Sequence, residues 1–333
     1  MRFLEDNGLR IFNGSSIAID CAKPKDGELA VITHAHSDHI FSGKSFNGSV
    51  LASHETLELL NGRLGSAKPV GKRFSEKAEF EGSEISLESS CHVLGSAQVI
   101  IEGEKKVVVT SDFQLQESLM LPKAQVHSAD ILVIESTFGL PEFEFPKRER
   151  IYGEIGKWVE ANAGDGKFTV LAGYSLGKAQ ELCKILSQYS QQVPLVHEKV
   201  FEFNKKYESL GVKLGGFELL NHNLKDFNVA ILPPHIVSRE LLQALHFSTG
   251  RKVVAGIATG WQSYNNAFSK IFPLSDHADF EQLVHYVKES GAKKVFTTHG
   301  FAKEFAKHLG RKLGVQAKPL DSKCQKTLEE FCD

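Results

Sequence analysis

The segment Thr33-His34-Ala35-His36-Ser37-Asp38-His39 follows directly on the apolar run Leu29-Ala30-Val31-Ile32. Three imidazoles and a carboxylate therefore stand together at the end of a segment that we expect to be a strand. Imidazole and carboxylate ligands suit zinc, manganese or iron, and ligands at this density favour two divalent ions held side by side. Paired ions about 3.5–4 Å apart are a common means of activating water against a phosphodiester or an acyl carbon.

Further candidate ligands recur downstream, each near the end of a strand-like run: His92, Asp112, His277 and His299. Any one of them alone would more often be a surface or core residue. Metal ligands need a rigid frame, and strand ends provide one. Their repetition in an α/β pattern therefore favours one shared metal centre.

Composition sets broad limits on the class of protein. The 333 residues carry 39 basic and 41 acidic side chains. This balance argues against a protein that coats DNA regardless of sequence, but a basic groove can still lie on a neutral protein. The five cysteines form no C-x-x-C pair, which favours reduced thiols in the cytoplasm. We expect no signal peptide at the N-terminus and no membrane span.

The pattern of elements predicts two domains. Short strand-like runs dominate the first part, and a solid apolar run over residues 130–135 predicts a buried strand. From about residue 148, helices and strands alternate. Candidate ligands at the ends of predicted elements reappear after about residue 270, where we predict a helix over 279–290, a strand over 294–297 and a helix over 302–313. We therefore predict one domain from residues 1–140 and 270–333, interrupted by an inserted α/β domain over residues 141–269.

The His34–His39 block resembles the signature of the metallo-β-lactamase fold superfamily. The motifs ESTFG (135–139) and SDHAD (275–279) resemble those of its β-CASP branch, nucleases of the RNase J, Artemis and polyadenylation-factor kind. HVLGSAQV (92–99), ESTFGLP (135–141), YSLGKAQ (174–180) and LSDHAD (274–279) are similar to a microbial subgroup called DNA-ligase-associated exonucleases. The resemblance implies an α/β fold, an αββα sandwich with metals at one edge and an inserted β-CASP domain.

The resemblance also implies a role for each ligand. The first metal would be bound by His34, His36 and His92; the second by Asp38, His39 and His299; Asp112 would bridge both. Asp20 matches an acidic motif that orients a ligand imidazole, although an aspartate there could simply form a turn.

His277 matches a general acid that protonates the leaving oxygen, and Glu135 matches the carboxylate that positions it. A departing alkoxide needs a proton, and a carboxylate partner keeps histidine protonated near neutral pH. The alternative is that the pair only holds two segments together.

Two turns are candidate substrate contacts. Ser175 and Lys178 stand at a predicted helix N-terminus, where backbone amides, a hydroxyl and a lysine could cradle a phosphate. Ser96 lies in the turn beside His92. A plain helix cap with a solvated lysine is the alternative. Cys91 and Ser111 stand where relatives in this branch usually have glycine.

Several functions are compatible with this reading. The first is a metal-dependent exonuclease that processes DNA ends in repair, with zinc or manganese. The second is an RNA-processing ribonuclease, which His299 alone does not exclude. A small-molecule hydrolase of thioesters or lactams is disfavoured by the Glu135–His277 pair and the inserted domain, and a non-enzymatic scaffold by the filled ligand positions. We expect a single-stranded DNA end, or RNA, as partner, and association with a DNA ligase or helicase is a further expectation.

Overall fold

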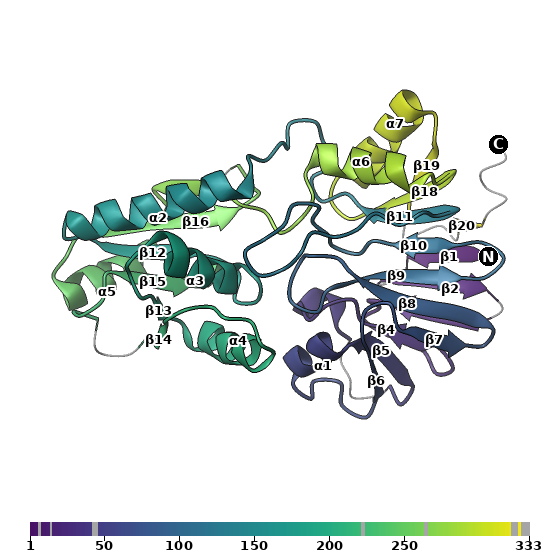
Figure 1. The fold of residues 1–333 in the computed structure, drawn as a ribbon, viewed down its shortest axis with the longest axis horizontal. Helices are drawn as coiled ribbons and strands as arrows, with labels where there is room; N and C mark the ends of the chain where they lie inside the picture. The colour runs from purple at the N-terminus through teal and green to yellow at the C-terminus, as the bar shows by residue number, and fades with distance from the viewer. Residues whose placement is uncertain are drawn as a thin grey trace. The chain divides into compact units, whose positions relative to one another are not determined.

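We describe the protein from a computed structural model, which defines residues 1–5, 8–13, 15–41, 46–220, 224–262, 266–320 and 326–327. Within these residues the strands form three sheets, and the chain divides into two compact units (Figure 1). Unit 1 contains Met1–Glu117, Lys123–Glu144 and His277–Asp333, and unit 2 contains Ser118–Pro122 and Phe145–Asp276. The mixed α/β class predicted from the sequence is confirmed.

The first sheet of unit 1 has the strand order β20-β1-β2-β3-β4-β5-β6. Its strands are β1 (Arg2–Glu5), β2 (Leu9–Asn13), β3 (Ser15–Ile19), β4 (Leu29–Val31), β5 (Ser49–Ser53), β6 (Lys68–Lys72) and β20 (Lys326–Thr327). The pairs β1–β2 and β2–β3 are antiparallel, whereas β3 to β6 run parallel to one another.

The second sheet of unit 1 has the order β19-β18-β11-β10-β9-β8-β7. Its strands are β7 (Lys77–Phe80), β8 (Ser83–Ser89), β9 (Ala97–Glu102), β10 (Val107–Val109), β11 (Ile131–Glu135), β18 (Lys294–Thr298) and β19 (Gln316–Pro319). The parallel strands β10, β11 and β18 end at the same edge, because carboxyl ends of parallel strands coincide. Asp112, Glu135 and His299 stand at or just beyond those ends.

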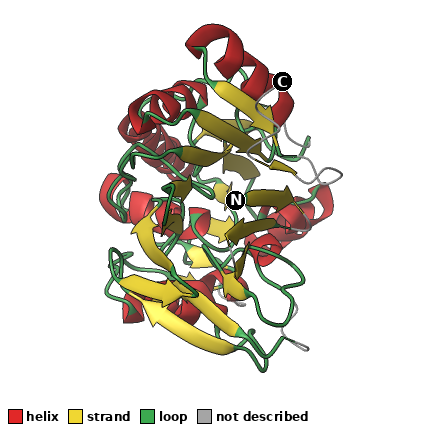
Figure 2. Ribbon diagram, turned by 90° about the vertical axis from the view of Figure 1, so that its right-hand side faces the viewer, coloured by secondary structure: helices red, strands yellow, loops and turns green. Residues whose placement is uncertain are grey.

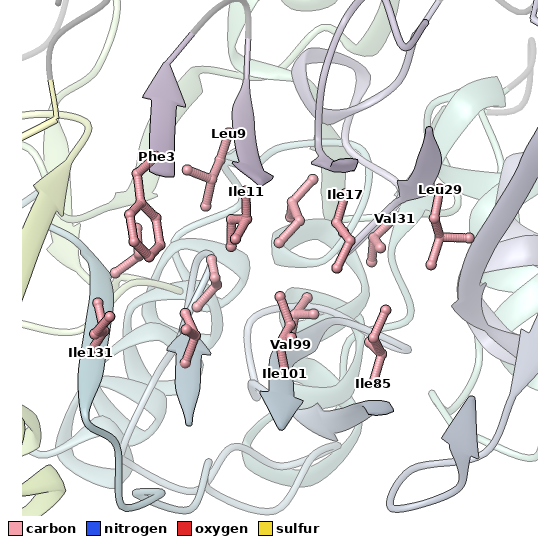
Figure 3. Packing of buried hydrophobic residues seen from close by; sticks show 14 of the residues in the cluster. Phe3, Leu9, Ile11, Ile17, Leu29, Val31, Ile85, Val99, Ile101 and Ile131 are labelled. Atoms are coloured by element: carbon pink, nitrogen blue, oxygen red, sulfur yellow. The ribbon is translucent and has the colours of Figure 1, made fainter. Parts of the chain in front are cut away.

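The apolar faces of the two sheets share one core (Figure 3). Alternation along a strand decides which residues enter it, because successive side chains point to opposite faces. Thus Ile131 and Val133 of β11 lie in this core, whereas Leu132 and Ile134 lie in a second cluster with helix α6. This double burial accounts for the unbroken apolar run that the sequence shows there.

The helices of unit 1 contact the strands of its two sheets; helices are red and strands yellow in Figure 2. They are α1 (His54–Leu60), α6 (Phe280–Ser290) and α7 (Ala302–Leu313), with a short 3₁₀ turn at Ser37–His39. Asp279 caps α6 by accepting a hydrogen bond from the Gln282 amide at 2.9 Å. The start of α6 is therefore fixed immediately after His277.

Unit 2 contains a parallel sheet in the order β14-β13-β15-β12-β16-β17. Its strands are β12 (Phe168–Ala172), β13 (Leu195–Val196), β14 (Glu218–Leu219), β15 (Val229–Leu232), β16 (Val253–Thr259) and β17 (Lys270–Pro273). Its helices are α2 (Arg148–Gly164), α3 (Lys178–Tyr189), α4 (Glu198–Ser209) and α5 (Arg239–Thr249), with a 3₁₀ turn at Pro234–Ile236. The neighbouring strands β12, β16 and β17 therefore present their carboxyl ends at one edge.

One prediction within this unit is wrong. Ser175 is not the N-cap of α3, which begins at Lys178 after Gly177. Gly177 has a φ of 90°, and its amide donates to the Gln180 side chain at 2.7 Å. A glycine in this left-handed conformation ends the preceding loop and delays the helix.

Among the described residues, Cys21, Cys91 and Cys183 are buried thiols outside any disulfide, whereas Cys324 and Cys332 lie outside the described residues. In the same part of the chain, no helix combines the length and apolar character that crossing a membrane requires.

Candidate metal centre

Three imidazoles converge in unit 1, two from the segment after β4 and one from the turn between β8 and β9. His36 Nδ1 lies 3.1 Å from His34 Nε2 and 3.1 Å from His92 Nε2. His34 and His92 are buried. Burial, followed by the charges of His39, His36 and His92, holds the pKa of His34 well below its usual range. A buried neutral imidazole facing two others is a suitable nitrogen donor set for zinc or a related ion.

Asp112 lies in the middle of this cluster. Its Oδ2 is 3.4 Å from His39 Nε2, 3.6 Å from His34 Nε2 and 3.8 Å from His92 Nε2. Burial raises the pKa of Asp112, but the surrounding imidazoles outweigh it and hold the pKa well below its usual range. Asp112 therefore lies near three of the candidate ligand imidazoles, and its bridging of two ions stays a prediction.

Asp20 holds the His39 imidazole from behind. Its Oδ2 accepts from His39 Nδ1 at 2.8 Å and from the Thr33 hydroxyl at 2.6 Å, and its Oδ1 accepts from the Thr33 amide at 2.8 Å. Burial opposes protonation of His39, yet Asp20, by its charge and its hydrogen bond, and Asp112 together raise the pKa of His39 to about 10. With Nδ1 bound to Asp20, Nε2 points to Asp112, as an outer carboxylate arranges for a ligand histidine.

Asp38 and His299 border the centre on a more open side. The Asp38 side chain is 80% exposed, and its Oδ2 lies 3.8 Å from His39 Nε2. The His299 ring lies 6.0 Å from the His39 ring. Both residues line a cavity of about 390 Å³ together with Asp20 and His39. The structure thus brings them to the centre without the close contacts that join the other candidate ligands.

Glu135 and His277 form a pair beside the cluster. Both Glu135 carboxylate oxygens lie close to His277 Nδ1, at 3.0 and 3.1 Å, and the glutamate is only 1% exposed. Glu135 also accepts from the Phe113 amide at 3.0 Å. His277, His92 and Asp112 have candidate donor atoms within 4.8 Å of one another. The pair therefore lies beside the cluster of candidate metal ligands.

The structure shows the surroundings of the three candidate substrate contacts, Ser96, Lys178 and Ser175. The Ser96 hydroxyl is buried and accepts from the amides of His92 and Val93 at 3.0 and 3.1 Å, so it shapes the His92 turn. Lys178 is 2% exposed, and its ammonium binds Glu181 at 2.7 Å and Asp276 at 2.6 Å. Ser175 is half-buried in the loop before α3.

Sequence reasoning missed two hydroxyls at the centre. Thr33 binds Asp20 and also lies 2.7 Å from the Ser111 hydroxyl. Thr33 stands within the histidine block, which was a usable signal. Cys91 and Ser111, the two positions where glycine is usual, have φ values of 58° and 49°. Both turns therefore need a left-handed residue, which explains the usual glycine.

A search of protein-family models matches none to this chain. Curated relatives include a probable DNA ligase of Opitutus terrae, 31% identical over 86% of this chain and 28% of that protein. Another is cleavage and polyadenylation specificity factor subunit 3 of Dictyostelium discoideum, 29% identical over 52% of this chain and 26% of its own length. An RNase J-like protein of Methanocaldococcus jannaschii is 21% identical over 63% of this chain and 58% of its own.

The chain thus spans about a quarter of the length of the first two relatives. Among solved structures, a protein of unknown function from Enterococcus faecalis has a TM-score of 0.61 at 11% identity, covering 89% of this chain and 92% of that one. This likeness concerns the fold.

The clustered imidazoles and carboxylates form a donor set that could hold metal ions. The relatives support the resemblance of this chain to the β-CASP branch of the metallo-β-lactamase fold and, within it, to the DNA-ligase-associated subgroup.

Proposed function

We propose that this protein is a metal-dependent phosphodiesterase that shortens nucleic-acid strands from an end, acting on DNA ends in repair in the cytoplasm. The observation that carries the proposal is the Glu135–His277 pair beside Asp112 and His92. A buried carboxylate that orients a histidine at a metal cluster serves reactions whose leaving group needs a proton. Loss of a sugar alkoxide from a phosphodiester is such a reaction.

The donor set fits two divalent ions, zinc or manganese. His34, His36 and His92 would hold one ion, and Asp38, His39 and His299 the other, with Asp112 between them. Such ions, when bound, provide Lewis acidity and lower the pKa of a coordinated water toward neutrality. Asp20 then orients His39, and Ser96 fixes the turn that carries His92.

His277 supplies the leaving-group proton in this scheme. Glu135 accepts a hydrogen bond from the Nδ1–H of His277 and stabilises the imidazolium, so that Nε2 can deliver its own proton to the departing oxygen. A thioester hydrolase has less need of such a pair, because a thiolate is a far better leaving group than a sugar alkoxide. The pair therefore favours the nuclease over a thioester hydrolase.

Exposed aromatic side chains in unit 2 favour a single-stranded substrate. Tyr174 follows β12 and is 52% exposed, and Trp261 follows β16 and is 39% exposed. Because β12 and β16 are neighbouring parallel strands, both rings belong to the same carboxyl edge of the sheet. Exposed aromatic rings are platforms on which unpaired bases stack without regard to sequence.

We assign unit 1 to the αββα metallo-β-lactamase domain and unit 2 to the inserted β-CASP domain. The sheets with a shared core and outer helices in unit 1, and the parallel sheet in unit 2, support this assignment. The Opitutus relative is described as a probable DNA ligase, and this supports cooperation with a ligase, or with a helicase that supplies single strands.

Matched single-stranded DNA and RNA, each labelled at the 5′ or the 3′ end and incubated with zinc or manganese, test the proposal. We expect progressive shortening of DNA, with the label revealing the polarity. Preferential cutting of RNA would make the protein an RNA-processing ribonuclease, which the RNase J-like relative supports as the second candidate. If neither DNA nor RNA is cleaved, a small-molecule hydrolase becomes the leading candidate function.

A further inference from the structure

A buried network of charges surrounds the residues that precede His277. In unit 2, the Arg148 guanidinium contacts the Glu181 carboxylate, donates to the Ser275 carbonyl at 2.6 Å and lies 3.6 Å from Asp276 Oδ1. Lys178 binds the same Asp276 oxygen at 2.6 Å and Glu181 at 2.7 Å. Ser275 and Asp276 are the residues immediately before His277 in the chain.

The network is balanced and internally satisfied. Two cations, Arg148 and Lys178, face two anions, Glu181 and Asp276. Tyr152 accepts from Arg148 Nε at 2.9 Å and donates to Glu181 at 2.7 Å. Arg148, Lys178 and Glu181 are almost completely buried. Burial alone would lower the pKa of Arg148, but Glu181, Tyr152 and Asp276 raise it above its usual value.

Buried ion pairs are poor sources of stability, because desolvation offsets most of the attraction between the charges. Apolar residues of similar volume would often serve as well. This network binds the Ser275 carbonyl and the Asp276 carboxylate despite its cost in desolvation. Its position points to a role in fixing the segment Ser275–His277. Satisfied polar networks select one geometry of the segments they join.

The other side of His277 is fixed within unit 1. Gln114 donates to the His277 carbonyl at 2.9 Å, and the Ala278 amide donates to the Phe113 carbonyl at 2.7 Å. Since the chain leaves unit 2 at Asp276 and enters unit 1 at His277, the two sets of contacts hold the segment on either side of the imidazole.

We propose that Arg148 is a positioning residue for His277: by holding the Ser275 carbonyl and, with Lys178, the Asp276 carboxylate, it fixes the segment that delivers the catalytic acid. The inference rests on the proposed function. It gives Lys178 a role different from the predicted phosphate contact, because its ammonium is bound to two carboxylates. A general acid must be within hydrogen-bond reach of the leaving oxygen, so a small displacement suffices to reduce its effect.

Two substrates separate positioning of the acid from other defects. A single-stranded oligonucleotide has an alkoxide leaving group that needs protonation. A thymidine p-nitrophenyl phosphodiester releases a stabilised phenolate, which needs none. A misplaced His277 therefore slows cleavage of the first substrate only, whereas damage to the metal centre or to the fold slows both.

The variants are Arg148→Gln and Asp276→Asn, compared with His277→Ala. Asp276→Asn is nearly isosteric and carries the test if Arg148→Gln does not fold. The matched control is Arg251→Gln, which removes another unit 2 arginine that binds Asn228 at 2.7 Å and the Leu224 carbonyl at 3.1 Å. Metal content and the fluorescence of Trp158 and Trp261, both in unit 2, report on integrity.

We expect kcat on the oligonucleotide to fall about 10-fold or more in both variants, part of the roughly 10²–10⁴-fold that a positioned acid supplies. KM, metal content and the rate on the aryl ester should stay near those of the wild type, and the control should resemble the wild type on both substrates. Equal losses on both substrates, a raised KM with unchanged kcat, or no loss would each overturn the proposal. Failure of the wild type to cleave either substrate would instead overturn the proposed function, and this inference with it.

Discussion

Individual residues at the ends of strands build the centre. Asp20, Cys91, Ser111 and His299 all have positive φ values, between 49° and 58°. A left-handed residue turns the chain sharply and lets short loops aim ligands at one point, at a cost of about 1–2 kcal/mol each that the surroundings must offset. The clustering of the candidate ligands was predictable, because several imidazoles and carboxylates recur at strand ends in the sequence. The left-handed turns were not, because serine and cysteine rarely signal that conformation.

Asp20→Asn tests the orienting contact at this scale. The amide cannot accept from both Thr33 and His39 as the carboxylate does, so His39 loses its fixed tautomer. We expect metal affinity to fall about 10–100-fold, the usual cost of losing an outer carboxylate. Competition with a chelator measures it. Asp130→Asn, which removes a surface carboxylate bound to the Lys106 amide, is the control, and equal affinities of the two variants would contradict the role.

At the scale of elements, periodicity predicted most of the core strands and helices. Helix α7 has the predicted bounds, and helix α6 and strand β18 each differ from prediction by one residue at one end. Strands on the sheet edges escaped prediction: β7 (Lys77–Phe80) has no buried residue, so no apolar pattern marks it. The start of α3 escaped as well, because the left-handed Gly177 and its contact with Gln180 override the capping signal of Ser175. Tertiary contacts decide such details.

The carboxyl edge of the unit 2 sheet allows a prediction about binding. Tyr174→Ala and Trp261→Ala should each raise KM for a single-stranded oligonucleotide about 5-fold or more, as expected from ~1–3 kcal/mol of stacking per base. Their kcat should change little, because neither ring belongs to the proton-transfer pair. Phe247→Ala removes an aromatic ring of α5 that is 81% exposed and serves as the control. An equally large rise in KM in that control would contradict the proposed stacking of bases on Tyr174 and Trp261.

At the scale of the whole molecule, the two units carry different chemistry. Unit 1 holds the candidate ligands and the Glu135–His277 pair, and unit 2 holds the buried charge network. Residues that match the motifs lie both before and after a section of alternating helices and strands. This pattern predicted one domain of residues 1–140 and 270–333 and a second domain of residues 141–269. The structure divides the chain near residues 144 and 276. The contacts of Asp276, which precedes His277 at that boundary, could not be predicted from the sequence. Its partner Lys178 lies 98 residues earlier in the chain.

The stability of unit 2 should depend on Glu181 in acid. Burial raises the pKa of Glu181, but Arg148 and Lys178 outweigh it, so that the folded pKa lies below the ordinary value of 4.5. A lowered folded pKa contributes stability that is present above pH 4.5 and is lost as the pH falls through the folded value. Unfolding in urea, followed by tryptophan fluorescence, should therefore show falling stability in acid.

Glu181→Gln should remove that dependence. It leaves Arg148 and Lys178 short of an anion, so we expect it to be about 3–5 kcal/mol less stable at pH 7, the usual cost of breaking a buried pair. Its free energy of unfolding should fall less steeply than that of the wild type as the pH decreases below 4.5. Glu154→Gln breaks an exposed pair with Arg150 and should cost less than about 1 kcal/mol. An equally steep loss of stability in acid for the wild type and Glu181→Gln would refute the role of Glu181.

The central claim is that His277 is the acid of a metal-dependent nuclease. The most direct measurement compares cleavage of end-labelled single-stranded DNA by the wild type, His277→Ala and His285→Ala, with the metal content of each determined in parallel. His285 is an exposed histidine on α6 and serves as the matched control. We predict that His277→Ala retains the metals but loses about 10²–10⁴-fold in rate, while His285→Ala resembles the wild type. Unchanged cleavage by His277→Ala with its metals bound would contradict the account.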